Sequence, residues 1–388
     1  MQTVAQIGAQ CPSTIPHTGS NNRCFSQGRR VPIFRREEIP TSPSVSSAVH
    51  RQQGRSSTRV VASTSSSFSS SPALAPPSLA ATTAGMEVSE VEIRPGVIEG
   101  FWLWEGHQIR YHRTANTDST LPPVLCIHGF GGNADHWRKN LPDLSSTCNA
   151  YAIDLLGYGF SDKPDPRKFP VNTIYNFENW GRQIRDFIRE KIGQPTILTC
   201  NSVGGLAGLQ AAIDEPELIP AVQIINISLR MLHESKQAPL AKPLVAALQN
   251  TLRTTNLGKL FFSQVATANA VKNVLKQCYC NSDAVTDELV ECILKPGLEP
   301  GAVDVFLDFI SYSGGPLPEQ LIKECPVPVS VVWGQEDPWE KLEWGRAFAT
   351  YSTVEEFIEL PGVGHCPQDE APHLVNPLIK DWVARHSS

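Results

Sequence analysis

The sequence predicts an α/β fold: a mostly parallel central sheet flanked by helices, with a helical cap inserted after the sixth strand. Two patterns support this prediction. Short apolar runs alternate with amphipathic segments along most of the 388 residues, which is typical of a parallel sheet covered by helices on both faces. The alternation is broken once, between Leu229 and Pro318, where helical patterns continue without a convincing strand.

The predicted strands begin with a short antiparallel pair, residues 101–104 and 108–111, joined across Glu105 and Gly106. Further apolar runs are expected to complete the sheet; they cover residues 124–127, 150–153, 196–200, 222–227, 327–333 and 354–360. Amphipathic segments between them predict helices over residues 175–191, 204–214 and 341–351. These helices would cover the two faces of the sheet.

The break in the alternation predicts a cap over residues 229–318. Its helical patterns cover residues 244–252, 270–278, 286–294 and 303–310. In an open α/β sheet the ligand crevice lies at the carboxyl ends of the strands, so we expect the insertion to cover that crevice. The core would then consist of two parts, residues 87–228 and 319–388.

The first 85 residues differ in composition from the rest: they are rich in Ser, Thr, Pro and Arg, with eight arginines against two acidic residues. Such a segment cannot bury enough apolar surface to offset its chain entropy. An Arg-rich, acid-poor start without an apolar run near Met1 is typical of a transit peptide rather than a secretory signal. We therefore predict that residues 1–86 are a disordered chloroplast transit peptide and linker, cleaved near Ala62. An untargeted tail and a mitochondrial address are the alternatives.

Composition excludes several functional classes. The formal net charge is −6, and the basic start leaves the remainder acidic, which argues against nucleic acid as the main partner. Ten scattered cysteines form no C-x-x-C pair, so we expect free thiols in a reduced compartment and no zinc site. No apolar stretch is long enough for a membrane-spanning helix, and we expect a soluble mature protein.

The strongest chemical signal is Ser202, which lies between an apolar run and a segment rich in Gly and Ala. A serine hydroxyl is a poor nucleophile unless it is exposed on a tight turn beside a base. A strand-to-helix turn of this kind needs small residues two positions before and after the serine, here Cys200 and Gly204. Cysteine replaces the usual glycine at the first position. The alternative is an ordinary serine at a helix N-terminus.

A second signal follows the first parallel strand, where His128, Gly129, Phe130, Gly131 and Gly132 form a glycine-rich loop. An oxyanion intermediate needs two aimed N–H donors; in this arrangement they come from such a loop and from the residue after the nucleophile. We expect these donors to be Phe130 and Val203. A phosphate-binding loop fits poorly, because the loop has neither G-x-G-x-x-G nor a following Lys-Ser/Thr.

Asp337 and His365 complete a candidate triad with Ser202. Each follows a predicted apolar strand, so all three fall at the carboxyl edge of the sheet, in the chain order serine, acid, histidine. Asp337 would accept a hydrogen bond from His365 Nδ1 and leave Nε2 free for the serine. Glu336 is a neighbouring rival for the acid, and we expect it to be a solvated loop charge instead.

Taken together, these motifs resemble the capped α/β-hydrolases, and more narrowly their plastid members such as pheophytinase and the chlorophyll dephytylases. The resemblance rests on residues 128–132, 136–137, 154–162, 201–205, 337–339 and 364–365. It implies an α/β-hydrolase fold and cleavage of a phytyl-type ester, with Trp137 lining the substrate pocket. We also expect His136 and Trp339 in that pocket. Haloalkane dehalogenases and epoxide hydrolases are similar in layout but use Asp as nucleophile, and Ser202 argues against both.

The predicted function is therefore hydrolysis of a small hydrophobic carboxylic ester through an acyl-enzyme, without metal or organic cofactor. A lyase or acyltransferase and a ligand-binding protein that retains the triad are the alternatives.

The cap is basic over residues 230–282 and acidic over residues 283–308. The basic half could contact an anionic plastid membrane. The expected location of the protein is the chloroplast stroma, in part associated with the thylakoid. We favour mutual pairing and solvation of the two halves, because charge runs usually decorate exposed helices.

Overall fold

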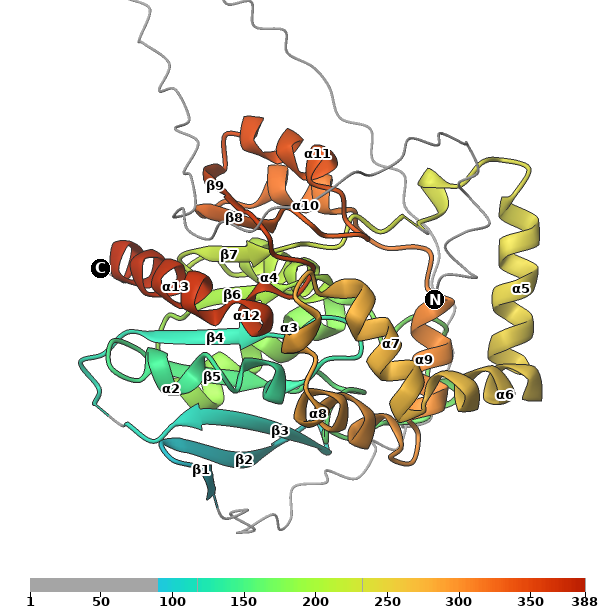
Figure 1. Ribbon diagram of the computed structural model, residues 1–388, viewed down its shortest axis with the longest axis horizontal. Coiled ribbons are helices and arrows are strands. Elements are labelled where there is room, and N and C mark those ends of the chain that lie inside the picture. The colour runs from blue at the N-terminus through green and yellow to red at the C-terminus, as the bar shows by residue number, and fades with distance from the viewer. Residues whose placement is uncertain (1–89, 117, 232, 388) are drawn as a thin grey trace, which may run out of the picture. The chain divides into compact units, whose positions relative to one another are not determined.

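The computed structural model describes residues 90–387 except 117 and 232 (Figure 1). The expected transit peptide and its cleavage near residue 62 lie outside the described residues.

The strands are β1 Val91–Arg94, β2 Val97–Trp104, β3 His107–Thr114, β4 Pro123–Ile127, β5 Asn149–Ile153, β6 Ile197–Asn201, β7 Val222–Ile225, β8 Val329–Gly334 and β9 Val354–Leu360. The helices are α2 Leu141–Leu144, α3 Phe177–Phe187, α4 Val203–Asp214, α5 Lys242–Thr254, α6 Asn256–Val265, α7 Ala268–Cys278, α8 Asp287–Gly297, α9 Ala302–Ile310, α10 Pro318–Glu324, α11 Leu342–Gly345, α12 Pro367–Glu370 and α13 Pro372–His386.

The nine strands form one mixed sheet in the order β1-β2-β3-β5-β4-β6-β7-β8-β9. The pairs from β1 to β3, and β3 with β5, are antiparallel. The pairs from β5 through β9 are all parallel. The predicted α/β fold with a mostly parallel sheet is confirmed.

Alternate residues of the central strand β4 point into two separate hydrophobic clusters, as strand geometry requires. Leu125 and Ile127 belong to a cluster that includes side chains of α3, α4 and α10. Val124 and Cys126 belong to the cluster that includes side chains of α2 and α13. Helices therefore cover both faces, which explains why the parallel strands are continuous apolar runs in the sequence.

Helices α5 to α9 lie between β7 and β8 in the chain and gather at one end of the sheet (Figure 1). The Asn133 side chain, in the loop after β4, donates to the backbone oxygen of Cys292 in α8 at 2.7 Å. His365, which follows β9, donates its backbone N–H to the oxygen of Cys278 in α7 at 2.8 Å. The insertion thus contacts loops that leave the carboxyl ends of the strands.

Strand β1 was not predicted from the sequence, and neither were helices α2, α6, α10, α12 and α13. β1 is a four-residue edge strand whose Val91 and Ile93 are exposed, so it has no buried face to produce an apolar signal. Because of β1, the insertion follows the seventh strand in chain order rather than the sixth. Helix α6 contains Gly258, a poor helix former; a Cβ at this position would lie 1.8 Å from the backbone oxygen of Leu252. The glycine lets α6 pack against the end of α5.

Candidate active site

Ser202 lies between the end of β6 and the start of α4, in a backbone conformation with φ 55° and ψ −123°. Residues with a Cβ rarely adopt this conformation, because the Cβ crowds the backbone. A strained turn of this kind brings the serine Oγ to the carboxyl edge of the sheet rather than into the helix. The side chain is buried.

Glycines make this turn possible. A Cβ on Gly204 would lie 2.4 Å from the backbone oxygen of His128, and a Cβ on Gly129 would lie 2.8 Å from the Cβ of Ser202. Such distances are too short for any side chain. The loop after β4 and the serine turn therefore pack directly against each other.

Cys200 stands where the strand-to-helix turn usually has glycine, and Gly208 provides the space for it. A Cβ on Gly208 would lie 2.5 Å from Cys200 Sγ, so the thiol occupies room that a larger residue in α4 would fill. The thiol is fully buried, and burial raises its pKa. Cys200 therefore acts as a small core side chain.

Ser202, His365 and Asp337 form a hydrogen-bonded series. His365 Nε2 lies 3.0 Å from Ser202 Oγ, and His365 Nδ1 lies 2.6 Å from Asp337 Oδ2. Asp337 comes from the loop after β8 and His365 from the loop after β9. The structure thus brings together the three residues selected from the sequence. Glu336, the rival acid, is exposed.

The charges of this series stabilise each other. Burial by itself would lower the pKa of His365, but attraction to Asp337, a hydrogen bond to it and the charge of Glu340 together raise that pKa. Burial would raise the pKa of Asp337; attraction and hydrogen bonding to His365, with backbone donors, outweigh this and lower it. Asp337 is therefore an anion that favours the imidazolium form of His365.

Asn226, which the sequence analysis did not select, supports Asp337. Its Nδ2 donates to Asp337 Oδ2 at 2.7 Å, and its Oδ1 accepts from the Gly334 N–H at 2.9 Å. Asn226 is fully buried and has a φ of 45°. The backbone N–H groups of Trp339 and Glu340 donate to the other carboxylate oxygen. The available signal was a polar residue directly after β7, at the same edge of the sheet as the serine.

Glu340 is a second buried carboxylate beside the site. One of its oxygens accepts from Ser228 Oγ at 3.1 Å, while Oε2 is buried without a hydrogen-bond partner among the described residues. Burial raises the pKa of Glu340 to about 7. Nothing in the local sequence distinguishes Glu340 from the solvated Glu336, because burial is decided by the tertiary packing.

The two expected oxyanion donors belong to the two segments that pack against each other at Ser202. Val203 is the first residue of α4, so its N–H has no partner within the helix. Phe130 lies in the loop that packs on Ser202, and its ring is stacked on Phe309 with ring centroids 5.2 Å apart. The ring centroids of Phe306 and Phe130 are 5.5 Å apart. Both partners belong to α9, so aromatic side chains of the insertion contact the glycine-rich loop.

The three expected pocket residues have different surroundings. Trp339 is partly exposed and its ring centroid is 5.0 Å from that of His365. His136 is buried, with Nε2 3.1 Å from the hydroxyl of Tyr279. Trp137 is fully buried in the cluster that includes Leu141 of α2. Trp137 thus contributes to the core, whereas Trp339 lies beside the hydrogen-bonded series.

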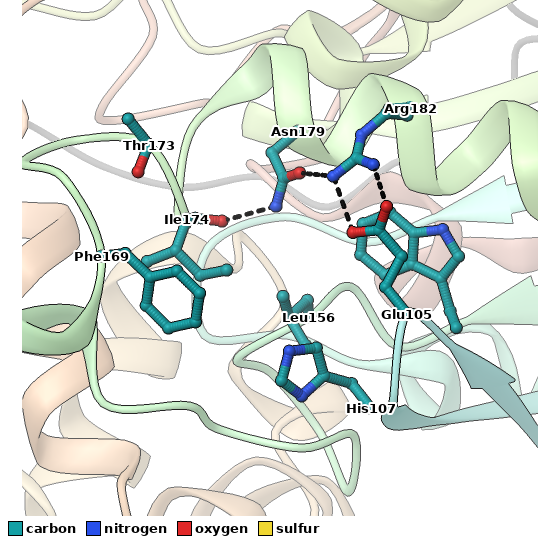
Figure 2. A pocket seen from close by; sticks show the side chains of 9 residues that line it. Glu105, His107, Leu156, Phe169, Thr173, Ile174, Asn179 and Arg182 are labelled. Atoms are coloured by element: carbon teal, nitrogen blue, oxygen red, sulfur yellow. Dashed lines mark hydrogen bonds and ion pairs between the residues drawn. The ribbon is translucent and has the colours of Figure 1, made fainter. Parts of the chain in front are cut away.

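A cavity of about 350 Å³ lies apart from these residues (Figure 2). Its lining consists of Trp104, Glu105, His107, Leu156, Phe169, Thr173, Ile174, Asn179 and Arg182. Figure 2 shows Arg182 bonded to Glu105 and Asn179. The charges of Arg182 and Glu105 therefore compensate each other. Ser202, His365 and Asp337 do not line the cavity. Among the described residues, no cluster of His, Cys, Asp or Glu side chains could hold a metal ion.

Residues 124–378, two thirds of the chain, match the alpha/beta hydrolase family. The chain belongs to this family. It is 26% identical to chloroplastic pheophytinase of Arabidopsis thaliana over 71% of this chain and 64% of that protein. It is also 24% identical to the human (lyso)-N-acylphosphatidylethanolamine lipase, over 67% of this chain and 78% of the relative.

Among solved structures, the epoxide hydrolase CorEH superposes with a TM-score of 0.60 at 16% identity, covering 74% of this chain and 99% of that one. At this identity the likeness shows the fold alone. The chain spans less than two thirds of pheophytinase, and these relatives are hydrolases with different activities. Family membership therefore indicates a hydrolase without naming the bond that is cleaved.

Proposed function

We propose that this protein is a serine hydrolase that cleaves a carboxylic ester, with Ser202 as nucleophile, His365 as general base and Asp337 as the residue that orients the base. The observation that carries the proposal is the continuous series of hydrogen bonds, 3.0 Å from serine to histidine and 2.6 Å from histidine to aspartate. The strained backbone of Ser202 supports it, because such strain recurs at functional sites.

In the proposed reaction, Ser202 Oγ attacks the ester carbonyl carbon while its proton passes to His365 Nε2. The carbonyl oxygen becomes an oxyanion that accepts hydrogen bonds from the N–H groups of Phe130 and Val203. Collapse of this intermediate expels the alcohol, which takes the proton from His365. A water molecule, deprotonated by His365, then attacks the acyl carbon, and release of the carboxylic acid restores the serine.

We propose that the substrate is a hydrophobic ester, and a phytyl ester of a chlorophyll-type pigment or an acyl lipid in particular. The aromatic rings of Phe130, Phe306 and Phe309 beside the serine turn favour an apolar ligand. The similarity to pheophytinase and to a lipase agrees with this class. An epoxide hydrolase is a weaker candidate despite the shared fold, because Ser202 occupies the position at which those enzymes have Asp.

A fluorophosphonate probe tests the nucleophile directly. We expect rapid labelling of the wild type and none of Ser202→Ala, with labelling of His365→Ala slower by at least about a thousandfold because the serine loses its base. Ser146→Ala is the matched control, since this serine is exposed and its hydroxyl donates to the backbone oxygen of Asp143, away from the site. Equal labelling of wild type and Ser202→Ala would refute the assignment. Esters of increasing alcohol length, ending with phytyl, would then rank the substrates.

Two other functions remain as alternatives. An acyltransferase or lyase could use the same side chains, and ¹⁸O-labelled water separates these from hydrolysis. A hydrolase places one ¹⁸O atom in the carboxylic acid product, whereas transfer to another acceptor or elimination leaves the product unlabelled. A ligand-binding protein would bind the ester stoichiometrically without turnover, which the same samples reveal by the absence of product.

We also propose that residues 1–86 direct the protein to the chloroplast, as a distant relative is chloroplastic and the segment is rich in arginine and poor in acids. Import assays with the full chain and isolated organelles test this. We expect uptake and shortening to about residue 62 in chloroplasts, and none in mitochondria. Replacing the eight arginines by glutamine should abolish uptake, whereas mitochondrial uptake of the wild type would contradict the proposal.

A further inference from the structure

Five leucines on the outer side of the insertion are exposed, and we call them the cap leucine face. They precede or belong to α5 and α6, with exposed fractions from 41% to 94%: Leu240, Leu244, Leu248, Leu257 and Leu260. No residue of α5 is buried, and only Gly258 is buried in α6. Large exposed apolar patches on soluble proteins mark interaction sites, so these two helices are a candidate for one.

The inner side of α5 is anchored, so the exposed side is fixed in orientation. Gln249 donates to the backbone oxygen of Ile310 at 3.1 Å, and Arg253 pairs with the buried Asp308 at 3.1 Å. Both partners belong to α9. Figure 1 shows α5 and α6 at the margin of the molecule, away from the sheet. The leucines therefore point away from the packed side of these helices.

The segment of sequence that carries these leucines has charges of one sign. Residues 235–282 contain no acidic residue and six basic ones. Lys272 and Arg253 pair with Asp287 and Asp308, which supports mutual pairing for part of the insertion. Lys242 and Lys259, which lie next to these leucines in the sequence, are exposed and form no ion pair within the described part of the chain. An apolar face flanked by unpaired lysines matches the interface of an anionic bilayer.

Aromatic side chains connect α6 to the serine turn. The ring centroids of Phe261 and Phe262 lie 6.4 and 5.2 Å from that of Phe306. Phe306 in turn lies 5.5 Å from Phe130, the expected oxyanion residue. The helix that carries Leu257 and Leu260 on its exposed side thus leads, through contacting rings, to the candidate active site.

We propose that the cap leucine face docks on an anionic lipid bilayer, with the leucines in the acyl boundary and Lys242 and Lys259 at the headgroups. Where the proposed ester hydrolysis also holds, this docking delivers a lipid-phase substrate along the rings of α6 and α9. No helix of the described residues is long and apolar enough to cross a bilayer. Docking itself requires no catalysis.

Cosedimentation of the full chain with vesicles tests the docking. We expect binding to vesicles with 30 mol% anionic lipid, weakened by salt, and little binding to purely zwitterionic vesicles. Leu244→Ser/Leu248→Ser/Leu257→Ser/Leu260→Ser and Lys242→Gln/Lys259→Gln should each reduce partitioning by at least about tenfold. The matched controls, Leu103→Ser/Leu298→Ser and Lys168→Gln/Lys323→Gln, change exposed residues elsewhere and should leave it unchanged. Thermal unfolding verifies that every variant is folded.

Several outcomes would overturn the docking. Unchanged partitioning of the leucine and lysine variants would assign any vesicle binding to another basic segment, such as the arginine-rich start. A concentration-dependent dimer that the leucine variant abolishes, without vesicle binding, would assign the face to a second copy of the chain. Ser202→Ala should bind vesicles like the wild type, so that loss of the esterase proposal and loss of the docking proposal are separate results.

Discussion

At the scale of single residues, the candidate site depends on how Asp337 is held. Its carboxylate accepts hydrogen bonds from His365, from Asn226 and from two backbone N–H groups. Four donors fix the direction in which the carboxylate faces the imidazole, and they keep it ionised although it is buried. The side chain of Asn226 is the one donor of this set that substitution can remove without altering the triad itself.

Replacing Asn226 with Ala should therefore impair the reaction through Asp337. We expect kcat for a soluble ester to fall by about tenfold or more while KM changes little, because substrate contacts are unaffected. The buried N–H of Gly334 also loses its acceptor, which should lower the free energy of unfolding by about 1–3 kcal/mol. Steady-state kinetics and urea unfolding measure the two effects; reduced stability with unchanged kcat would limit Asn226 to a structural role.

Glu340 makes the site sensitive to pH. Its pKa is raised from 4.5 to about 7, so between these values the folded protein binds more protons than the unfolded one. Below pH 4.5 the carboxyl is neutral in both states, and its burial then costs the folded state no ionisation energy. The folded state loses stability relative to the unfolded state as pH rises through about 7. Glu340→Gln should then be nearly neutral at pH 5 and stabilising at pH 8, by up to about 3 kcal/mol. Chemical unfolding at the two pH values checks this.

The same substitution should move the pH profile of activity. The charge of Glu340 helps to raise the pKa of His365, and His365 must be neutral to accept the serine proton. Removing that charge lowers the histidine pKa, so the acid limb of kcat/KM should shift to lower pH in Glu340→Gln. Glu336→Gln, an exposed neighbour, is the control. An unchanged or upward-shifted limb would show that Glu340 does not act on His365.

At the scale of elements, the junction of β6 and α4 positions the serine. Three glycines allow the close packing: Gly129 and Gly204 bring the loop after β4 against the turn, and Gly208 makes room for the Cys200 thiol. The departure from glycine at position 200 is thus matched by Gly208, the sixth residue of α4. A pair of residues, rather than either alone, preserves the geometry of the turn.

Gly208→Ala should be destabilising although alanine is the better helix former. The added Cβ would approach Cys200 Sγ to 2.5 Å, and overpacking of this kind costs about 1–3 kcal/mol. Cys200→Ala in the same chain removes the clash and should restore most of the stability and the rate of probe labelling. Thermal unfolding of the two single variants and the double variant measures the coupling. Additive effects would mean that the two side chains do not compete for space.

At the scale of the whole molecule, the insertion is tied to the loop that carries His365. The backbone oxygen of Cys278 accepts from the His365 N–H. Glu370, at the end of α12, accepts from the backbone N–H groups of both Asn281 and Gly364. One carboxylate therefore links a loop of the insertion to the loop that carries His365, so the position of His365 depends on the insertion.

Glu370→Ala should loosen this link. We expect kcat to fall several-fold and probe labelling of Ser202 to slow, because two backbone donors lose their acceptor and the histidine loop gains freedom. Glu370→Gln keeps an acceptor oxygen and should be intermediate. Glu324→Ala, an exposed glutamate in α10, serves as the control. Full activity of Glu370→Ala would show that the hydrogen bond between Cys278 and His365 is sufficient by itself to position the histidine loop.

The sequence by itself determined the α/β fold and the positions of Ser202, Asp337 and His365, which the structure brings into one hydrogen-bonded series. Each of these residues lies in the turn or loop after an apolar run, and parallel strands carry such residues to the same edge of the sheet, so the local pattern was sufficient. The tertiary structure decided the support of Asp337 by Asn226, the burial of Glu340 and the place of Trp137 in the core. It also decided which leucines of the insertion face outward. These features arise from contacts between segments far apart in the chain, and no local pattern of residues encodes them.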